Sequence, residues 1–382
     1  MTEFRIDQLR SETYEALKKM GIGELSEIQK SCIPAALEGR DVYACAPTGT
    51  GKTAAYLIPV LEHAQQQMKT KHKPCAVILS PTRELASQIA DVSRKLLSTR
   101  EGIRTALLTG GTDMNRQVRS FRNSADIVVG TPARICDHLR RHTLKTDEIR
   151  YLIIDEADEM LTMGFYEDVR NAVNALSGCQ ILMFSATDTE QTRKLASEIL
   201  RDPVEIRISS DPLLKHRIRL YHCICKESDK QAVLKELLHR NEAPQILIFC
   251  SMRNTCDRIS SMLRSIGYSC DTVHSEMDPN VRRRIMRSFK DHRIRILTAT
   301  DVAARGIDIA DVRLVINYDC PQDIRSFVHR IGRTGRSNTE GIVISVFTEK
   351  ESAELTLLQK ETGLTSEKLN IRVRKHNRRQ PV

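Results

Sequence analysis

The sequence predicts an α/β fold of two tandem domains, each built on a doubly wound, mostly parallel sheet. Short apolar runs alternate with stretches of helical pattern along most of the 382 residues, as is typical of such sheets. Turn-forming residues interrupt this alternation in ISSDPLLKH at 208–216, after which it resumes. The length also favours more than one domain. We therefore expect domains at 1–208 and 217–370, a linker at 209–216 and a basic tail at 371–382.

Apolar runs predict the strands of both sheets, and a helical stretch follows each run. In the first domain the runs are VYACA (42–46), AVILS (76–80), DIVVG (126–130), RYLIID (150–155) and ILMFSA (181–186). In the second they are ILIFC (246–250), IRILTAT (294–300), RLVINYD (313–319) and GIVISVF (341–347). The last predicted helix begins with a capping box, Thr348 and Glu351. Ligands of such sheets bind at the carboxyl ends of the strands, where the unusual residues of this chain fall.

The composition is that of a soluble protein in a reducing compartment. No apolar run approaches the roughly 18 residues that a membrane span needs, and the start, MTEFRIDQLR, lacks the pattern of a signal peptide. The eleven cysteines form no CxxC pair, and HCIC at 222–225 is favoured as a buried strand over a zinc site. We expect an intracellular protein, with the cytoplasm and the nucleus or nucleolus both open.

The excess positive charge is confined to the second half of the chain. Residues 1–208 carry 28 Lys and Arg against 28 Asp and Glu, whereas residues 209–382 carry 31 against 21. Half of this excess lies in the last twelve residues, IRVRKHNRRQPV. Clustered positive charge indicates a polyanionic partner bound through phosphates, although a solvated tail would explain the last segment equally well.

A phosphate-binding loop is predicted at APTGTGKT, between a strand and a helix. Its glycines let successive backbone N–H groups face inward, and the helix N-terminus adds its positive end. Lys52 can reach the outer phosphates and the Thr53 hydroxyl can bind Mg²⁺. The usual pattern begins with Gly rather than Ala46, so the strand–loop–helix context carries the prediction. The expected nucleotide-binding residues are Ala46, Pro47, Thr48, Gly49, Thr50, Gly51, Lys52 and Thr53.

Carboxylates follow another apolar strand, in Asp155-Glu156-Ala157-Asp158. Asp155 suits water-mediated Mg²⁺ binding, and Glu156 suits orienting or deprotonating an attacking water. Acidic residues at a helix N-terminus are favourable in any case. Together with the phosphate loop, however, they indicate hydrolysis of a nucleoside triphosphate.

Three arginines repeat every third residue in HRIGRTGR at 329–336. Two glycines interrupt them, and each costs about 1 kcal/mol inside a helix, so we expect a held loop that presents Arg330, Arg333 and Arg336 to an anion. The second domain has no phosphate loop of its own, so the expected anion is the nucleotide of the first domain. An arginine finger contributes roughly 10³–10⁵ in rate. Its placement on another domain would make hydrolysis depend on domain closure.

Seven short motifs occur in a fixed order along the chain: PTRELA (81–86), TGG (109–111), GTPAR (130–134), DEAD (155–158), SAT (185–187), TATDVAARGID (298–308) and HRIGRTGR (329–336). By these motifs the chain resembles the DEAD-box RNA helicases of superfamily 2 over nearly its whole length. In size it is similar to the minimal helicases of the translation-initiation type. The resemblance implies two RecA-like domains, ATP and Mg²⁺ as cofactors, and RNA as the partner.

The resemblance also implies roles for single residues. Adenine would be recognised and sandwiched by Gln29 and Phe4, and the ribose and phosphates would meet Gly306 and Asp308. The catalytic residues would be Lys52, Asp155, Glu156, Arg333 and Arg336, with Thr53 and Asp155 at the metal. Hydrolysis would be linked to domain closure by Asp158, Ser185, Thr187 and His329, with Arg330 at the same interface.

RNA would be gripped by its backbone. Aromatic residues make up 4% of the chain and tryptophan is absent, so little is available for base stacking and sequence-specific reading is not expected. Contacts with phosphates and 2′-hydroxyls would distinguish RNA from DNA. The resemblance assigns these contacts to Pro81, Thr82, Arg83, Gly110, Gly111, Thr131 and Arg134 in the first domain and to Arg253, Arg282 and Thr300 in the second.

Three positions depart from the family pattern. LSEIQ (25–29) replaces PTPIQ but keeps Gln29, Ala133 replaces a glycine, and Pro279 stands where a glutamine opens the family's QxxR motif. None of these changes removes a catalytic group.

We therefore expect an RNA-dependent ATPase that unwinds short duplexes or remodels RNA–protein complexes. An ATP-gated RNA clamp with weak turnover is the alternative, and an ATPase acting on another substrate is disfavoured by PTRELA and by the basic second domain. Translation initiation, ribosome assembly and RNA surveillance are all compatible with the sequence. Specificity would come largely from protein partners or from the basic tail.

Overall fold

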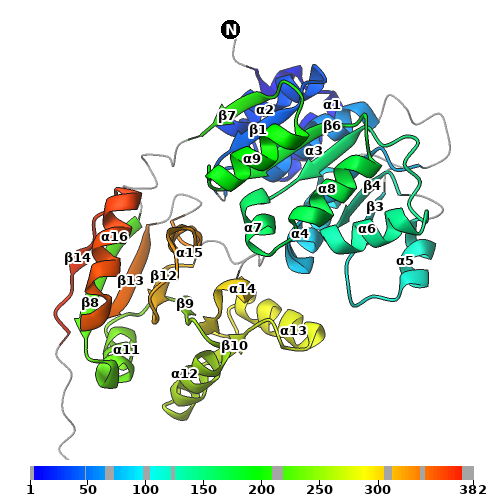
Figure 1. Cartoon of the computed structure of the whole chain (residues 1–382). Helices are drawn as coiled ribbons and strands as arrows, with labels where there is room; N and C mark the ends of the chain where they lie inside the picture. Colours follow the sequence, from blue (N-terminus) through cyan, green and yellow to red (C-terminus); the bar gives the residue numbers. More distant parts are fainter. Residues whose placement is uncertain are drawn as a thin grey trace, which may run out of the picture. The chain divides into compact units, whose positions relative to one another are not determined.

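The computed structural model describes residues 4–47, 49–64, 73–97, 104–121, 125–208, 218–304, 312–335 and 340–371. Within these ranges the chain divides into two compact units, one on each side of the gap at 209–217. Each unit contains a seven-stranded sheet in which all paired strands are parallel (Figure 1). This confirms the predicted fold class. The predicted linker, and the predicted tail apart from Ile371, lie outside the described residues.

The first unit has the strand order β3-β4-β2-β5-β6-β1-β7. Its strands are β1 (Val42–Cys45), β2 (Ala76–Leu79), β3 (Thr105–Leu108), β4 (Ile127–Gly130), β5 (Tyr151–Ile154), β6 (Gln180–Ser185) and β7 (Val204–Arg207). Its helices are η1 (Ile6–Gln8), α1 (Ser11–Lys19), α2 (Glu27–Leu37), α3 (Lys52–Ala64), α4 (Arg83–Leu96), α5 (Met114–Phe121), α6 (Pro132–Arg140), α7 (Ala157–Thr162), α8 (Tyr166–Ala175) and α9 (Glu190–Ile199). Alternate strand residues belong to different apolar clusters, with Ile78 in one and Val77 in the other, so the sheet is buried on both faces.

The second unit has the strand order β10-β11-β9-β12-β13-β8-β14. Its strands are β8 (Ile218–Cys225), β9 (Ile246–Phe249), β10 (Cys270–Val273), β11 (Ile296–Ala299), β12 (Leu314–Asn317), β13 (Gly341–Thr348) and β14 (Glu367–Lys368). Its helices are η2 (Glu227–Asp229), α11 (Lys230–His239), α12 (Arg253–Ser265), α13 (Pro279–Lys290), α14 (Asp301–Ala304), α15 (Ile324–Ile331), η3 (Glu349–Glu351) and α16 (Ser352–Thr362). The predicted capping box is present, because the Thr348 N–H donates to Glu351 Oε2 (2.7 Å), although it opens η3 rather than α16 itself.

Every strand that the apolar runs predict is present, and HCIC forms the end of β8. The structure adds β3, β7, β10 and β14, which are the edge strands of the two sheets. Among the described residues, no helix combines the length and the apolarity that crossing a membrane would require.

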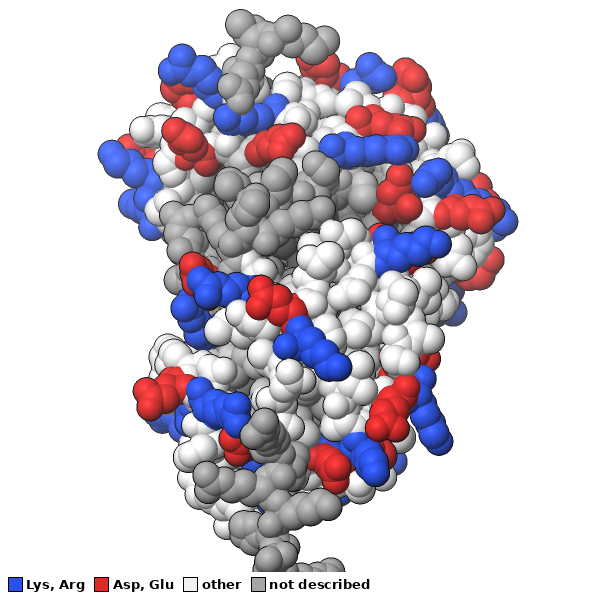
Figure 2. Space-filling view, turned by 90° about the vertical axis from the view of Figure 1, so that its left-hand side faces the viewer, with Lys and Arg blue, Asp and Glu red and all other residues white. Residues whose placement is uncertain are grey.

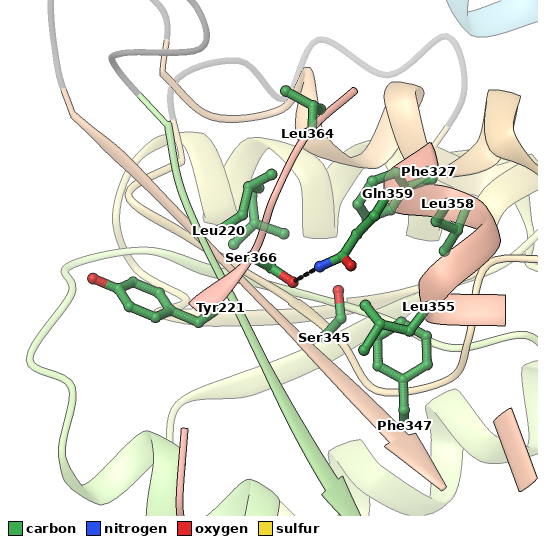
Figure 3. Close-up of a pocket in the computed structure, with 11 residues that line it drawn as sticks. Leu220, Tyr221, Phe327, Ser345, Phe347, Leu355, Leu358, Gln359, Leu364 and Ser366 are labelled. Carbon is green, nitrogen blue, oxygen red and sulfur yellow. Dashed lines mark hydrogen bonds between the residues drawn. The ribbon is translucent and has the colours of Figure 1, made fainter. Parts of the chain in front are cut away.

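A small cavity lies under α16 in the second unit (Figure 3). Apolar side chains such as Leu220, Phe327 and Leu358 line it, and Gln359 Nε2 donates to Ser366 Oγ (3.0 Å) at its edge. Its volume of about 10 Å³ is close to the minimum for one water molecule. The cavity is therefore a packing gap and too small for a ligand.

Candidate nucleotide site and RNA-contacting residues

The phosphate loop connects β1 to α3 and encloses the Lys52 ammonium. Lys52 Nζ donates to the Ala46 carbonyl (2.9 Å), and the Thr50 hydroxyl donates to the Pro47 carbonyl (2.8 Å). Both loop glycines have positive φ, 87° and 94°, in the left-handed region that favours glycine. Lys52 is only 6% exposed. Its charge and the positive end of α3 therefore make the loop suited to an anion.

Gln29 of α2 contacts the phosphate loop directly. Its Oε1 accepts from the Ser26 N–H (3.0 Å), and its Nε2 donates to the Gly51 carbonyl (3.1 Å). A Cβ atom on Gly51 would lie 2.4 Å from Gln29 Nε2. Phe4 packs against the neighbouring apolar cluster. Gln29 thus supports the loop, in addition to the adenine recognition that the family resemblance assigns to it.

Replacing Gly51 by alanine is expected to displace Gln29 and weaken ATP binding by about tenfold, or ~1.4 kcal/mol. The positive φ adds a destabilisation of about 1–2 kcal/mol. The matched control is Gly39→Ala, because Gly39 has a similar φ of 80° but no atom within 4 Å of the place where a Cβ would lie. Unfolding curves and ATP titrations of both variants are the measurement. Equal loss of ATP affinity in the two would contradict a specific role for Gln29.

Asp155 and Glu156 follow β5, which is separated from β1 only by β6. Asp155 Oδ2 accepts from the Tyr56 hydroxyl (2.8 Å) and Oδ1 accepts from the Glu156 N–H (3.0 Å). Burial raises the pKa of Asp155 to about 6, and the Lys52 ammonium acts in the opposite direction. Glu156 has a φ of 53°. Such strain costs about 1–3 kcal/mol and is typical of functional sites.

Tyr56 is a site residue that the motifs do not predict. Its fully buried hydroxyl donates to Asp155 Oδ2 (2.8 Å), and its ring packs edge-on against Phe184 with centroids 5.2 Å apart. The Tyr56 hydroxyl also interacts with the Thr53 hydroxyl, so Thr53 and the Asp155 carboxylate lie beside the same tyrosine. Mg²⁺ is usually bound by one or two carboxylates together with substrate phosphates and waters, so this pair fits it. The three-residue spacing from Thr53 on α3 is the signal that indicates Tyr56.

Asp158 ties the SAT segment after β6 to α7. Its Oδ2 accepts from both the N–H (3.0 Å) and the hydroxyl (2.7 Å) of Thr187, and its Oδ1 accepts from the Ala186 N–H (3.4 Å). The Ser185 hydroxyl donates to the Thr187 carbonyl (2.7 Å), and the Ser185 carbonyl accepts from the Ala46 N–H (3.0 Å). The DEAD, SAT and phosphate-loop segments are thus joined by hydrogen bonds within one unit.

In the first unit, Arg83 and Arg134 lie against the turn that follows β3. A Cβ atom on Gly111 would lie 2.4 Å from Arg83 Nη1. Arg134 Nη2 donates to the Thr112 carbonyl (3.2 Å). The other predicted RNA-binding residues of this unit lie in the same turn or directly follow the neighbouring strands β2 and β4: Gly110, Pro81, Thr82 and Thr131. The structure therefore gathers them at one edge of the sheet.

Buried hydrogen bonds support this turn from the interior. Gln117 Nε2 donates to the Thr109 carbonyl (2.7 Å), and Gln117 Oε1 lies 3.0 Å from His138 Nε2. His138 Nδ1 lies 2.8 Å from the Thr143 hydroxyl. Burial lowers the pKa of His138 to about 4, so its imidazole is neutral at neutral pH. Neither Gln117 nor His138 belongs to a motif, and only the tertiary structure identifies them.

HRIGRTGR is helical in its first three residues, where we expected a loop, because α15 extends to Ile331. The glycines follow the last helical turn, so their helix penalty does not apply there. Arg330 does not present its guanidinium to an anion outside the unit. It is 1% exposed, and its Nε and Nη2 donate to the two oxygens of Asp301 (2.6 and 2.7 Å). Since a buried guanidinium requires a carboxylate partner, Arg330 forms a structural ion pair with Asp301. The neighbouring residues His329 and Arg333 are also mostly buried.

Replacing Arg330 by methionine is expected to destabilise the second unit by about 3–5 kcal/mol, because the Asp301 carboxylate loses its buried partner. The control is Arg219→Met, which breaks an exposed pair with Glu340 (3.2 Å) and should change stability by less than about 1 kcal/mol. Chemical denaturation of both variants is the measurement. Similar losses in the two would argue against a structural role for Arg330.

The predicted RNA-binding residues of the second unit surround the start of α13 and the end of β11. Arg253 contacts the Glu276 carboxylate in the loop before α13. Arg282 is 9% exposed and its Nη2 donates to the Ala303 carbonyl (2.8 Å). Thr300 directly follows β11. Four predicted site residues lie outside the described residues: Thr48, Gly306, Asp308 and Arg336.

Two departures from the family pattern are accommodated locally. Ala133 is exposed on α6. Pro279 is the first residue of α13, a position that suits proline because its missing N–H has no helical partner there. Asp278 caps the helix by accepting from the N–H groups of Asn280 (2.8 Å) and Val281 (3.2 Å).

Comparison with known proteins identifies the family. The DEAD/DEAH box helicase model matches residues 26–195, and the helicase conserved C-terminal domain model matches residues 229–338. The ATP-dependent RNA helicase CshA of Listeria monocytogenes is 38% identical over 363 residues, which are 95% of this chain and 69% of that protein. The chain belongs to the DEAD-box ATP-dependent RNA helicases. This DEAD-box helicase is therefore an RNA-dependent ATPase with helicase activity.

Solved structures of other DEAD-box proteins share the fold. A DEAD box protein from Methanococcus jannaschii is 36% identical, with a TM-score of 0.57 over 97% of this chain and 100% of that one. Dbp5 of S. cerevisiae, bound to RNA and ADP BeF3, is 29% identical, with a TM-score of 0.84 over 95% of each chain. Both sheets of this DEAD-box helicase are thus RecA-like.

Proposed function

We propose that this DEAD-box helicase hydrolyses ATP when ATP and RNA together draw its two units closed, and that closure unwinds short RNA duplexes or remodels RNA–protein complexes. The proposal rests on the three segments that directly follow β1, β5 and β6. These neighbouring strands bring together Lys52, the Asp155–Glu156 pair and the Asp158–Thr187 contact. Phosphoryl transfer to water needs groups that bind the phosphates, a carboxylate that binds the metal and a base for the attacking water.

Each group of the first unit has a separate role in the proposal. Lys52 and the phosphate loop bind the outer phosphates, and Gln29 with Phe4 holds adenine. Thr53 and Asp155 hold Mg²⁺, which would neutralise charge on the phosphates. Glu156 orients or deprotonates the attacking water.

The second unit completes the site only on closure. Arg333 and Arg336 stabilise the charge that develops on the γ-phosphate, and Gly306 and Asp308 meet the ribose and phosphates. His329 and the Asp158–Thr187 contact link closure to hydrolysis. A site divided in this way hydrolyses ATP only when the units meet.

RNA is bound through its backbone, without reading of base sequence. The basic and glycine-containing segments that follow β3, β2 and β4 in the first unit, with Arg83 and Arg134, offer contacts to phosphates and 2′-hydroxyls. The solved RNA complex of Dbp5, a protein of the same fold and family, supports RNA as the partner. Because backbone contacts carry no sequence information, protein partners would supply specificity.

The test is the steady-state ATPase rate with and without a mixed-sequence single-stranded RNA, at two salt concentrations. We expect strong stimulation by RNA, which weakens at high salt because phosphate contacts release counterions. ATP and RNA binding without turnover would indicate the RNA clamp instead. No response to RNA at either salt concentration would contradict the proposal.

A further inference from the structure

We propose that the exposed face of α13 is an additional surface for the RNA backbone, which holds RNA flanking the segment bound by the helicase core. The inference rests on the proposed function, since it presumes RNA as the partner. The surface, here called the α13 basic face, consists of Arg283, Arg284, Arg287, Lys290 and Arg293.

The α13 segment accounts for all the excess charge of the second half outside the tail. Residues 209–370 carry 26 Lys and Arg against 21 Asp and Glu. Within them, residues 279–295 carry seven against one, and the other residues carry 19 against 20. Residues 209–370 are therefore close to neutral apart from α13 and the turn that follows it.

The charges lie on the side of α13 that faces solvent. Ile285, Met286 and Phe289 are 6%, 9% and 1% exposed and pack into the unit. On the helix, the four basic residues of the α13 basic face fall within an arc of about 120° opposite that apolar side, and all four are exposed. The side chain of Arg287 is 85% exposed, and that of Arg293, just after the helix, 76%. Figure 1 shows α13 at the periphery of its unit.

The α13 basic face differs from an ordinary solvated helix surface. Such a surface usually mixes both signs, as on the face of the molecule in Figure 2, where basic and acidic side chains are interspersed. On α13, Arg283 and Arg287 (i,i+4) and Arg284 and Arg287 (i,i+3) are pairs of like charge, which disfavour the helix in the absence of a polyanion. Asp291 is the only acidic residue of the segment, and it lies 4.0 Å from both Arg287 and Arg293. A polyanion would relieve this repulsion.

The chemistry and the position both favour RNA as the occupant. Four of the five residues are arginines, whose planar forks match phosphate oxygens. Arg282, in the first turn of the same helix, and Arg253, which contacts the loop before it, are predicted RNA-binding residues. The α13 basic face therefore begins where those contacts end. RNA that extends beyond the core can continue along it for the helix length of about 18 Å.

The test is equilibrium binding of labelled RNA to the full chain with a non-hydrolysable ATP analogue, across a series of salt concentrations. The variant combines Arg283→Gln, Arg284→Gln and Arg287→Gln. The control removes three positive charges from exposed lysines of the first unit, by Lys18→Gln, Lys19→Gln and Lys194→Gln. Three RNA probes are used. The first is a single strand of about 10 nucleotides, which is within the site size of one single-strand-binding module. The second is a single strand several times longer, and the third is the short strand extended by a duplex.

We expect the α13 variant to bind the longer RNAs at least about tenfold more weakly, with the slope of log K against log salt reduced by about 2. Its binding of the short strand stays unchanged, which also shows that it is folded. If affinity falls only for the duplex-flanked probe, the α13 basic face binds flanking duplex RNA. If affinity falls for the long single strand, the face binds flanking unpaired RNA.

Equal losses of RNA affinity in the control variant would overturn the proposal. Unchanged binding of both extended probes by the α13 variant would also overturn it, and would leave an acidic protein as the partner for this face. Because binding is measured without turnover, a chain that binds RNA but lacks RNA-stimulated ATPase would contradict the proposed function and not this inference.

Discussion

Replacing Arg333 by alanine is expected to lower RNA-stimulated ATP turnover by about 10³–10⁵-fold, because the charge developing on the γ-phosphate would lose the arginine finger that we propose. Arg333 follows α15 and is 8% exposed, and its carbonyl accepts from the Val312 N–H (3.1 Å), so its backbone is held in place. The steady-state ATPase rate at saturating ATP and RNA is the measurement. ATP affinity should change far less than turnover, since the finger acts in the transition state.

Two further variants make the Arg333 result specific. Arg333→Lys keeps the charge but not the planar fork, and should recover only part of the rate. Arg240→Ala removes an arginine from an exposed i,i+4 pair with Glu236 in the same unit and should leave the rate unchanged. Full turnover by Arg333→Ala would mean that the second unit supplies no finger through this residue.

Replacing Glu156 by glutamine is expected to slow hydrolysis by about 10²–10⁴-fold, because an amide cannot accept the proton of the attacking water. ATP and RNA should still bind, since Lys52, Thr53 and Asp155 are intact. If hydrolysis opens the closed state, the variant should hold both ligands and release RNA slowly. Single-turnover hydrolysis and RNA dissociation rates are the measurements.

The matched control for Glu156 is Glu167→Gln, the same isosteric change at a glutamate whose side chain is 74% exposed. It should behave as the unmodified protein in both assays. Rapid RNA release by Glu156→Gln in the presence of ATP would argue against a link between closure and hydrolysis.

The strands that the apolar runs predict are all interior strands of the two sheets, and of the interior strand β8 only the end, HCIC, is predicted. The strands that they do not predict are β3, β7, β10 and β14, one at each edge. The difference follows from burial. An interior parallel strand is covered on both faces and reads as a continuous apolar run, as in IVVG of β4. An edge strand is partly exposed, so β7 (VEIR) and β14 (EK) carry charged residues that no apolar pattern detects.

The arginines of HRIGRTGR show a second limit of sequence reasoning. Their three-residue spacing indicates three equivalent guanidiniums, yet Arg330 is paired with Asp301, which lies 29 positions earlier in the chain. A spacing rule treats each side chain by its neighbours along the chain. The spacing does not show which carboxylate the fold places beside each arginine.

The sequence by itself determined the α/β fold, because this fold depends on the period of apolar residues, and it predicts a phosphate loop after β1 and carboxylates after β5 from residues that are close together in the chain. Contacts between distant segments were decided only by the tertiary structure. Tyr56 donates to Asp155, Gln29 donates to the Gly51 carbonyl, and Asp158 accepts from Thr187 of the SAT segment. The contacts of Asp155 and Asp158 depend on the order of β5, β6 and β1 in the sheet, which no local pattern encodes.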